Sequence, residues 1–317
     1  MQLFDVGIDL AHLRGVCEVY MMETKALNTE IAYGHAWKVF RDWCRTCGRD
    51  SLPASGDTVA LYVAWLLEEK RLNVKTVRVK LSGIAWRHRK DGHPSPVTYS
   101  VNGMLRTAAR RQRRKPRAKA AVTPDQLARV AGLDLGGTVK GVRDRTAFLI
   151  GFALSWRRSE LASLDLDDIE LIRRGAIVRL GRSKGDQEGE GRVVRLPYGS
   201  DPLTCPVRAL KSWLAVRGGW AGPLFCSVNR HGTAVVGERI SGQVICGAVQ
   251  DLLSRVGADE RRYGAHSLRA GMITAAAEQG ADVISIQQRT GHRSLDMVLK
   301  YVRPVEAFRR DPLAGVL

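Results

Sequence analysis

The sequence predicts a mainly α-helical protein with one small β-sheet, and three observations lead to this fold class. Apolar residues recur at the three-and-four spacing of helices along most of the 317 residues. Two β-branched runs, at 176–180 and 192–196, depart from this spacing and are typical of a hairpin. A basic, proline-containing run at 110–119 cannot pack into a core and so separates two helical regions. We therefore expect domains at 1–112 and 123–317, joined by a basic linker at 113–122.

Four amphipathic helices are expected in the first domain. The first begins near Asn28 and ends at Gly48, and Asp57 can cap the second. The four apolar stripes are Ala32, Ala36, Val39, Phe40 and Trp43; Val59, Val63, Leu66 and Leu67; Val74, Val77, Leu81 and Ile84; and Val101, Met104, Leu105 and Ala108. Together they predict a small helical bundle.

The second domain opens with a capping box at Thr123-Pro-Asp-Gln126, which indicates the start of a helix. The region from Arg143 to Trp156 predicts a buried central helix, because Ser155 is the only polar residue between 147 and 156. After the hairpin the chain returns to helices. Their expected ranges are 206–216, 241–256, 266–279 with Gly280 closing it, and a last helix that Ser294 can cap.

The charge balance points to a polyanionic partner. Lys and Arg outnumber Asp and Glu by 50 to 32, for a formal charge of +18. Nucleic acid binds such a surface with release of counterions. An anionic membrane would also attract the charge, but no stretch reaches the ~18 uninterrupted apolar residues of a span, and we expect no membrane association. Acidic residues near the N-terminus, where a secretory signal is basic, favour the cytoplasm.

Six cysteines show no framework spacing and are expected to be free thiols. Cys44 and Cys47 form the one close pair. Without further Cys or His partners nearby, we do not expect a zinc site there.

The third helix sets a basic face opposite its apolar stripe. A solvated face is the plainer interpretation of that helix alone, but eight Lys or Arg and no acid between 106 and 119 favour contact with phosphates. The candidate DNA-contacting residues are Lys75, Arg78, Lys80, Arg87, Arg110, Arg111, Arg113, Arg114, Lys115 and Arg117.

Chemistry-bearing residues gather in the second domain. In chain order they are Arg157 with Glu160, Lys184 in the hairpin loop, His266 and Arg269, Gly291-His292, and Tyr301. Each has a structural explanation when taken singly. The His-x-x-Arg pair fits a surface pair or cap, Arg157 fits a salt bridge, and Tyr301 beside Met297 and Val298 fits a core position.

In this order the set resembles the active site of the tyrosine recombinase (phage integrase) family. The match covers about 123–305, and a helical domain before a basic linker resembles the family's core-site DNA-binding domain. Arg158 offers an alternative register for the first arginine, but Glu160, three residues after Arg157, favours Arg157.

The resemblance implies a role for each residue, and the residue types suit those roles. Arg157 and Arg269 would bind the nonbridging phosphate oxygens, because two guanidiniums can meet the charge that develops there. Tyr301 would be the nucleophile and His266 its proton acceptor, while Lys184 would protonate the leaving 5′ oxygen. His292 would hydrogen-bond the phosphate, and Glu160 would support Arg157 or His266.

The resemblance also implies an assembly. The helical DNA-binding domain and the mixed α/β catalytic domain would form a clamp on double-stranded DNA, with four subunits exchanging strands on paired sites through a 3′-phosphotyrosine. Off DNA, the protein could be a monomer or a dimer. We expect it to be cytoplasmic and associated with the nucleoid. The apolar tail, with Val305, Phe308, Leu313, Val316 and Leu317, could pack on a neighbour or on its own domain. Asp165, Asp167 and Asp168 match a helix-to-strand connection of the family, and we expect neither metal nor cofactor.

Three other functions stay open. A type IB topoisomerase-like enzyme would use similar chemistry to relax supercoils as a monomer. A DNA-binding regulator could keep the fold without strand transfer. A phosphatase or nuclease that uses the Arg/His cluster would release free hydrolysis products.

Overall fold

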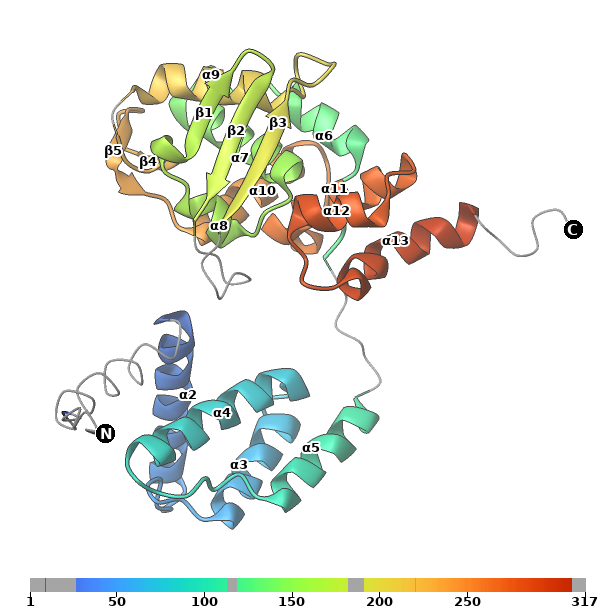
Figure 1. Ribbon diagram of the computed structural model, residues 1–317. Helices are drawn as coiled ribbons and strands as arrows, with labels where there is room; N and C mark the ends of the chain where they lie inside the picture. Colours follow the sequence, from blue (N-terminus) through green and yellow to red (C-terminus); the bar gives the residue numbers. More distant parts are fainter. Residues whose placement is uncertain (1–8, 10–26, 113–118, 182–190, 220, 310–317) are drawn as a thin grey trace, which may run out of the picture. The chain divides into compact units, whose positions relative to one another are not determined.

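The computed structural model describes residue 9 and residues 27–112, 119–181, 191–219 and 221–309 (Figure 1). The chain divides into two compact units, Met1–Pro116 and Arg117–Leu317. Across the described residues, no helix has the length and apolar character needed to cross a membrane. The apolar side chains of the tail, from Val305 to Leu317, lie outside what the structure describes.

The first unit is a bundle whose described helices are α2 (Leu27–Thr46), α3 (Gly56–Glu68), α4 (Val74–Lys90) and α5 (Tyr99–Arg111). The predicted stripe of α4 is buried throughout, and residues of α2, α3 and α5 supply the rest of the core. Two details differ from the prediction. Ala32 is exposed, because the buried face of α2 runs through Ala36, Phe40 and Cys44. Ser55 rather than Asp57 caps α3, since its hydroxyl accepts from the Thr58 N–H at 3.1 Å.

The second unit begins with α6 (Pro124–Ala131), whose Thr123–Gln126 capping box is formed as predicted. Its other described helices are α7 (Val139–Leu154), α8 (Arg158–Ser163), α9 (Pro206–Arg217), α10 (Gly242–Arg255), α11 (Ala265–Glu278), α12 (Val283–Thr290) and α13 (Leu295–Arg309), with short turns η1 (Leu166–Asp168) and η2 (Glu260–Arg262). The three acids from Asp165 to Asp168 lie in the connection between α8 and the first strand, as expected.

The predicted hairpin consists of β2 (Gly175–Leu180) and β3 (Arg192–Pro197), paired antiparallel with Val178 opposite Val194. A third strand, β1 (Ile169–Ile172), joins the other edge of β2, and β4 (Cys226–Val228) pairs with β5 (Ala234–Arg239) in a second small sheet. The prediction of a single hairpin sheet was therefore incomplete. Three- and four-residue strands carry too little alternation to stand out, and β1 is half-exposed or exposed along its whole length.

Helix α7 is the centre of the second unit. Ala147, Ile150 and Leu154 pack with the sheet and α9, while Phe148 and Leu149 pack with α6, α10 and α11. Each fully buried Ile, Leu or Phe side chain of this set contributes roughly 1.5–3 kcal/mol. The predicted buried helix is thus present, although it begins earlier, at Val139, and ends before Ser155.

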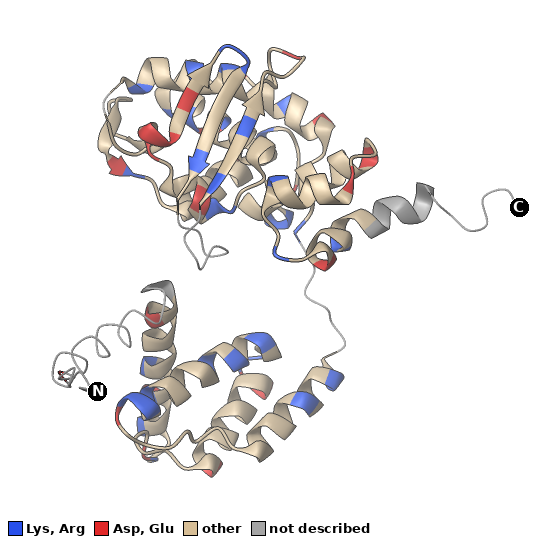
Figure 2. Cartoon of the chain, viewed as in Figure 1, with Lys and Arg blue, Asp and Glu red and all other residues tan. Residues whose placement is uncertain are grey.

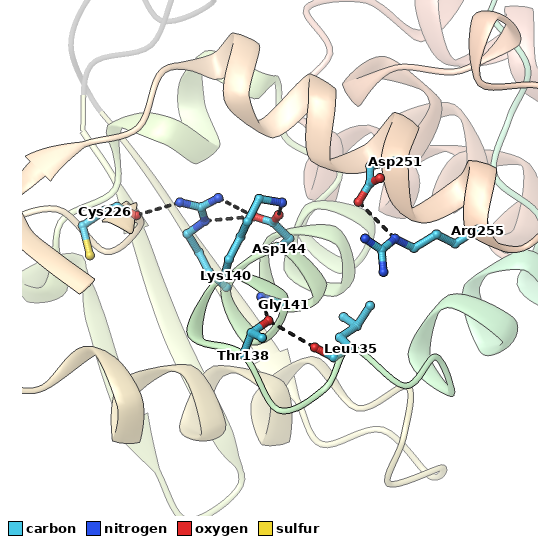
Figure 3. A network of polar contacts seen from close by, with 9 residues as sticks. Leu135, Thr138, Lys140, Gly141, Asp144, Cys226, Asp251 and Arg255 are labelled. Carbon is cyan, nitrogen blue, oxygen red and sulfur yellow. Dashed lines mark hydrogen bonds and ion pairs between the residues drawn. The ribbon is translucent and has the colours of Figure 1, made fainter. Parts of the chain in front are cut away.

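The start of α7 carries a buried ion pair that ties the helix to β4. Arg143 Nε donates to Asp144 Oδ1 at 2.8 Å and its Nη1 donates to the Cys226 carbonyl at 3.2 Å. Lys140 donates to the other Asp144 oxygen at 2.7 Å (Figure 3). Because Arg143 and Asp144 side chains are each 5% exposed, the pair has little access to water and anchors the helix start.

Candidate active site

A turn at the end of α7 directs the first candidate arginine. Ser155 has a φ of +57°, a left-handed conformation that is uncommon for a residue with a side chain. Its carbonyl accepts a hydrogen bond from Arg269 Nη1 at 2.7 Å, so the turn is fixed to α11. Trp156 then enters the core at 2% exposure, and Arg157 follows as the N-cap of α8.

Glu160 holds Arg157 in place. Its Oε2 accepts from the Arg157 backbone N–H at 2.9 Å, and its Oε1 pairs with Arg157 Nη1. Glu160 is 4% exposed, whereas a third of the Arg157 side chain faces solvent. Of the two supporting contacts that the sequence left open, the structure has the one to Arg157. Arg158 lies elsewhere, exposed and bonded to Gln243 at 3.0 Å.

Arg269 is a buried guanidinium with a spare donor. It is 1% exposed, and its Nη2 has no hydrogen-bond partner among the residues that the structure describes. Burial, and then the charge of Arg157, lowers the pKa of Arg269 to about 10, so the group is still cationic at neutral pH. A buried N–H without an acceptor is costly, which is the signature of a site completed by an anion.

His266 faces the candidate nucleophile. Its Nε2 lies 2.8 Å from the hydroxyl of Tyr301 on α13, which is hydrogen-bond distance. Partial desolvation of the imidazole, then the charges of Arg269 and Arg157, lower the pKa of His266. The ring is therefore neutral at pH 7 and can accept a proton. The first turn of α11 is held by the segment that leads into α6, because the Val122 N–H donates to the Ser267 carbonyl at 3.0 Å.

Tyr301 is half-buried, and it lies beside Val298 and Val302, which are both buried. Met297 is 38% exposed and stands away from this core, although helical spacing placed it on the tyrosine's face. Only the apolar ring of Tyr301 packs in the core. Its hydroxyl points to His266, which differs from the plain core position that its neighbours allowed.

His292 is held by the turn that follows α12. Gly291 caps that helix with a φ of +63°, and the next residue, His292, is 6% exposed. Its Nδ1 lies 2.6 Å from the hydroxyl of the buried Thr290. Burial, followed by the charges of Arg269 and Arg157, lowers the pKa of His292 to about 4. The imidazole is thus neutral, and its Nε2 is not engaged by Thr290.

One basic side chain of the cluster was not predicted from the sequence. Arg192, the first residue of β3, places its guanidinium 5.1 Å from the centroid of the Trp156 ring. A Cβ built on Gly291 would overlap its Nη1, so the guanidinium also lies against that turn. No motif marks this arginine, because strand register alone brings it to the site. Lys184, in the hairpin loop, lies outside the described residues.

The arrangement suits an anion. Three guanidiniums and one carboxylate come together from three separate segments, next to two neutral imidazoles and a phenol. No group of three or more His, Cys, Asp or Glu that could hold a metal occurs in the described part of the chain.

In the first unit, burial raises the pKa of the Cys44 thiol to about 11, while Cys47 is exposed.

The candidate DNA-contacting residues of the first unit lie on α4 and at the end of α5, where Figure 2 shows basic segments. Lys75 and Arg78 are exposed, while Lys80 and Arg87 are half-buried. Arg87 pairs with Asp91 and lies over the ring of Trp37, so its guanidinium is less available to bind a DNA phosphate. Arg110 and Arg111 are exposed. Outside the described residues lie Arg113, Arg114, Lys115 and Arg117.

Sequence comparison relates the chain to known proteins. Residues 122–307 match the model of the phage integrase family. The integrase/recombinase XerD homolog of Selenomonas ruminantium is 32% identical over 295 residues, which cover 92% of this chain and 86% of that protein. Recombinase Cre of Escherichia phage P1 is 24% identical over 298 residues, covering 86% of this chain and 85% of that protein.

Solved structures share the fold. A lambda integrase dimer bound to a COC′ core site has a TM-score of 0.60 at 16% identity, covering 92% of this chain and 94% of that chain. The Tn1549 transposon integrase in complex with transposon right-end DNA has a TM-score of 0.58 at 15% identity, covering 94% and 98%. The predicted fold class, mainly helical with a small sheet, is confirmed by this likeness, with a second small sheet that was not predicted.

Proposed function

Because the chain belongs to the phage integrase family of tyrosine recombinases, we propose that it is a site-specific recombinase that cleaves and rejoins duplex DNA through a 3′-phosphotyrosine intermediate. The observation that carries the proposal is the 2.8 Å contact between His266 Nε2 and the Tyr301 hydroxyl, beside a buried arginine with an unpaired donor. A base on a nucleophile, next to an anion site, is what transfer of a phosphodiester requires.

Cleavage begins with loss of the Tyr301 proton to His266. The phenolate oxygen attacks the scissile phosphorus, and a P–O bond to tyrosine forms as the P–O5′ bond breaks. Negative charge grows on the nonbridging oxygens, where Arg269 offers its free Nη2 donors and Arg157 its exposed side. Preorganised guanidiniums need little rearrangement at this stage, since Glu160 and the Ser155 carbonyl already hold them.

The leaving 5′ oxygen takes a proton from Lys184 in this proposal, and the product is a 5′ hydroxyl beside a 3′-phosphotyrosine. Rejoining reverses the step with the 5′ hydroxyl of another strand as the nucleophile. One phosphodiester replaces another each time, so no external energy source enters the balance.

His292 supplies a further donor to the phosphate. Its Nε2 carries the hydrogen when Nδ1 accepts from the Thr290 hydroxyl, which lies 2.6 Å from Nδ1 and 3.3 Å from the Gln287 carbonyl. The lowered pKa of His292 keeps the ring a neutral hydrogen-bond donor rather than a fourth cation.

Duplex binding is assigned to both units. Exposed Lys75, Arg78, Arg110 and Arg111 would contact phosphates without reading bases, and the unit carrying the site would hold the scissile bond. A lambda integrase tetramer bound to a Holliday junction shares the fold, with a TM-score of 0.58 at 15% identity, and we propose a tetramer on paired sites here too.

The experiment is a denaturing gel for covalent adducts on nicked duplexes drawn from DNA that flanks the gene. Wild type should form an adduct that Tyr301→Phe does not. Tyr198→Phe is the matched control, because Tyr198 is a half-buried tyrosine of the same unit whose ring stacks under Arg208 and Lys211. Loss of the adduct in this control as well would remove the special role of Tyr301.

The same reactions separate the rival functions. Relaxation of supercoils without preference for a site would favour the topoisomerase-like function. Tight DNA binding with no adduct on any flanking duplex would favour the regulator, and free hydrolysis products would favour a nuclease or phosphatase.

A further inference from the structure

Arg192 lies between two turns that each precede a proposed catalytic residue. Its guanidinium stacks on Trp156, the residue before Arg157, and its Nη1 lies against Gly291, the residue before His292. These two turns are far apart in sequence and belong to different helices. The side chain of Arg192 therefore touches the supports of both residues.

Trp156 and Gly291 are each held by their own surroundings, and the Arg192 side chain contacts both of them. Trp156 is 2% exposed and cannot move without opening the core around the end of α7. Gly291 approaches so closely that a Cβ there would overlap the guanidinium as Arg192 now lies. Arg192 itself is fixed at its backbone by the pairing of β3 with β2, opposite Leu180.

The chemistry of the contact requires arginine. A planar guanidinium can lie flat on an indole and still present its edge to a backbone turn, which an ammonium cannot do. Its Nε and Nη2 are buried and have no hydrogen-bond partner among the described residues. Glu160 is the nearby carboxylate that offsets its charge, and Arg157 is a nearby cation that opposes it.

We propose that Arg192 is a positioning residue for strand cleavage: it keeps the Trp156–Arg157 turn and the Gly291–His292 turn at the separation at which both side chains meet one phosphate. This inference rests on the proposed recombinase function. It adds a residue that acts through Arg157 and His292.

The test compares Arg192→Gln and Arg192→Lys with wild type in single-turnover cleavage of a nicked duplex at saturating protein. Arg179→Gln is the matched control, because it removes one exposed arginine from the neighbouring strand, where Arg179 pairs with Glu170. DNA affinity and thermal unfolding are measured for every variant, so that binding and folding defects are seen separately from the rate.

The expected result is a cleavage rate about 10- to 100-fold lower in Arg192→Gln, in line with the cost of slightly misplaced catalytic groups. Affinity should change no more than in Arg179→Gln. Arg192→Lys should stay slow, because it restores the charge but not the planar group that contacts both Trp156 and the Gly291 turn. A rate within about twofold of wild type in Arg192→Gln, or full rescue by lysine, would overturn the inference.

A second readout does not depend on activity. Burial, then the charges of Arg269, Arg157 and His266, lower the pKa of His292, and the charge of Arg192 adds to this in the same direction. An NMR titration should therefore show the His292 pKa raised in Arg192→Gln and little changed in Arg192→Lys. An unchanged value in Arg192→Gln would show that the guanidinium is not beside His292. Absence of any wild-type adduct would instead count against the recombinase function, and the titration would still decide the contact.

Discussion

Acid should destabilise the second unit through His292, and the size of the effect follows from its burial. The pKa of His292 is about 4 in the folded protein against the usual 6.5 of an unfolded imidazole. The folded value is the lower one, so the unfolded chain binds the extra proton, and stability present above pH 6.5 is lost as the pH falls towards 4. Between pH 8 and pH 5 the loss from this residue is roughly 2 kcal/mol.

The assay is urea unfolding of the full chain at both pH values and constant ionic strength. The methyl NMR signal of Ile273, buried in α11, reports the second unit separately from the first. His292→Asn cannot take up the proton and keeps an amide near Thr290, so its stability should fall by roughly 2 kcal/mol less than that of wild type. Parallel losses in the two proteins, within about 0.5 kcal/mol, would refute the buried neutral imidazole.

Three further predictions concern the site and its support. The cleavage rate should stay above half its plateau at pH 6.5, because the pKa of His266 lies below that value; a single-turnover profile with its midpoint above 6.5 would contradict this. Gly291→Ala should cost at least about 1–3 kcal/mol in thermal unfolding, since φ is +63° and a Cβ overlaps a guanidinium, whereas Gly247→Ala, in open space on α10, should be neutral or stabilising. Asp144→Asn should cost about 3–5 kcal/mol by leaving a buried arginine unpaired; a loss no larger than that of exposed Asp251→Asn would be inconsistent with the ion pair of Figure 3.

Local sequence was sufficient for most of the fold. The Thr123–Gln126 capping box, the buried stripe of α4 and the β2–β3 pairing are decided by residues close together in the chain, and all were predictable. The strand β1 was not, because its four residues gain their order from pairing with β2 rather than from a pattern of their own. The prediction of Asp57 as the cap of α3 was wrong, because the helix begins one residue before Asp57 and the Ser55 hydroxyl accepts from the Thr58 N–H.

The site divides in the same way. The order of the motifs was enough to single out Arg157, His266 and Tyr301, but only the fold shows that a hydroxyl lies 2.8 Å from an imidazole 35 residues away. Arg192 carried no signal at all. The sequence Gly-Arg-Val-Val has the appearance of an ordinary strand start, and its relation to Trp156 and Gly291 depends on the three-dimensional packing of β3.

The electrostatics of the site argue that DNA completes a structure which the free protein holds at a cost. Arg269 keeps its charge although its pKa falls from 12.5 to about 10, a penalty on the cationic form of roughly 3 kcal/mol, caused by burial and by Arg157. Glu160 offsets part of this repulsion and is already bonded to Arg157. A phosphodiester between the arginines would supply the missing acceptor for Arg269 Nη2 and the missing negative charge together. The transition state carries more charge on those oxygens than the ground state does. The repulsion between the two arginines is therefore relieved more in the transition state than in bound substrate. Such preferential stabilisation of the transition state is the condition for catalysis rather than mere binding.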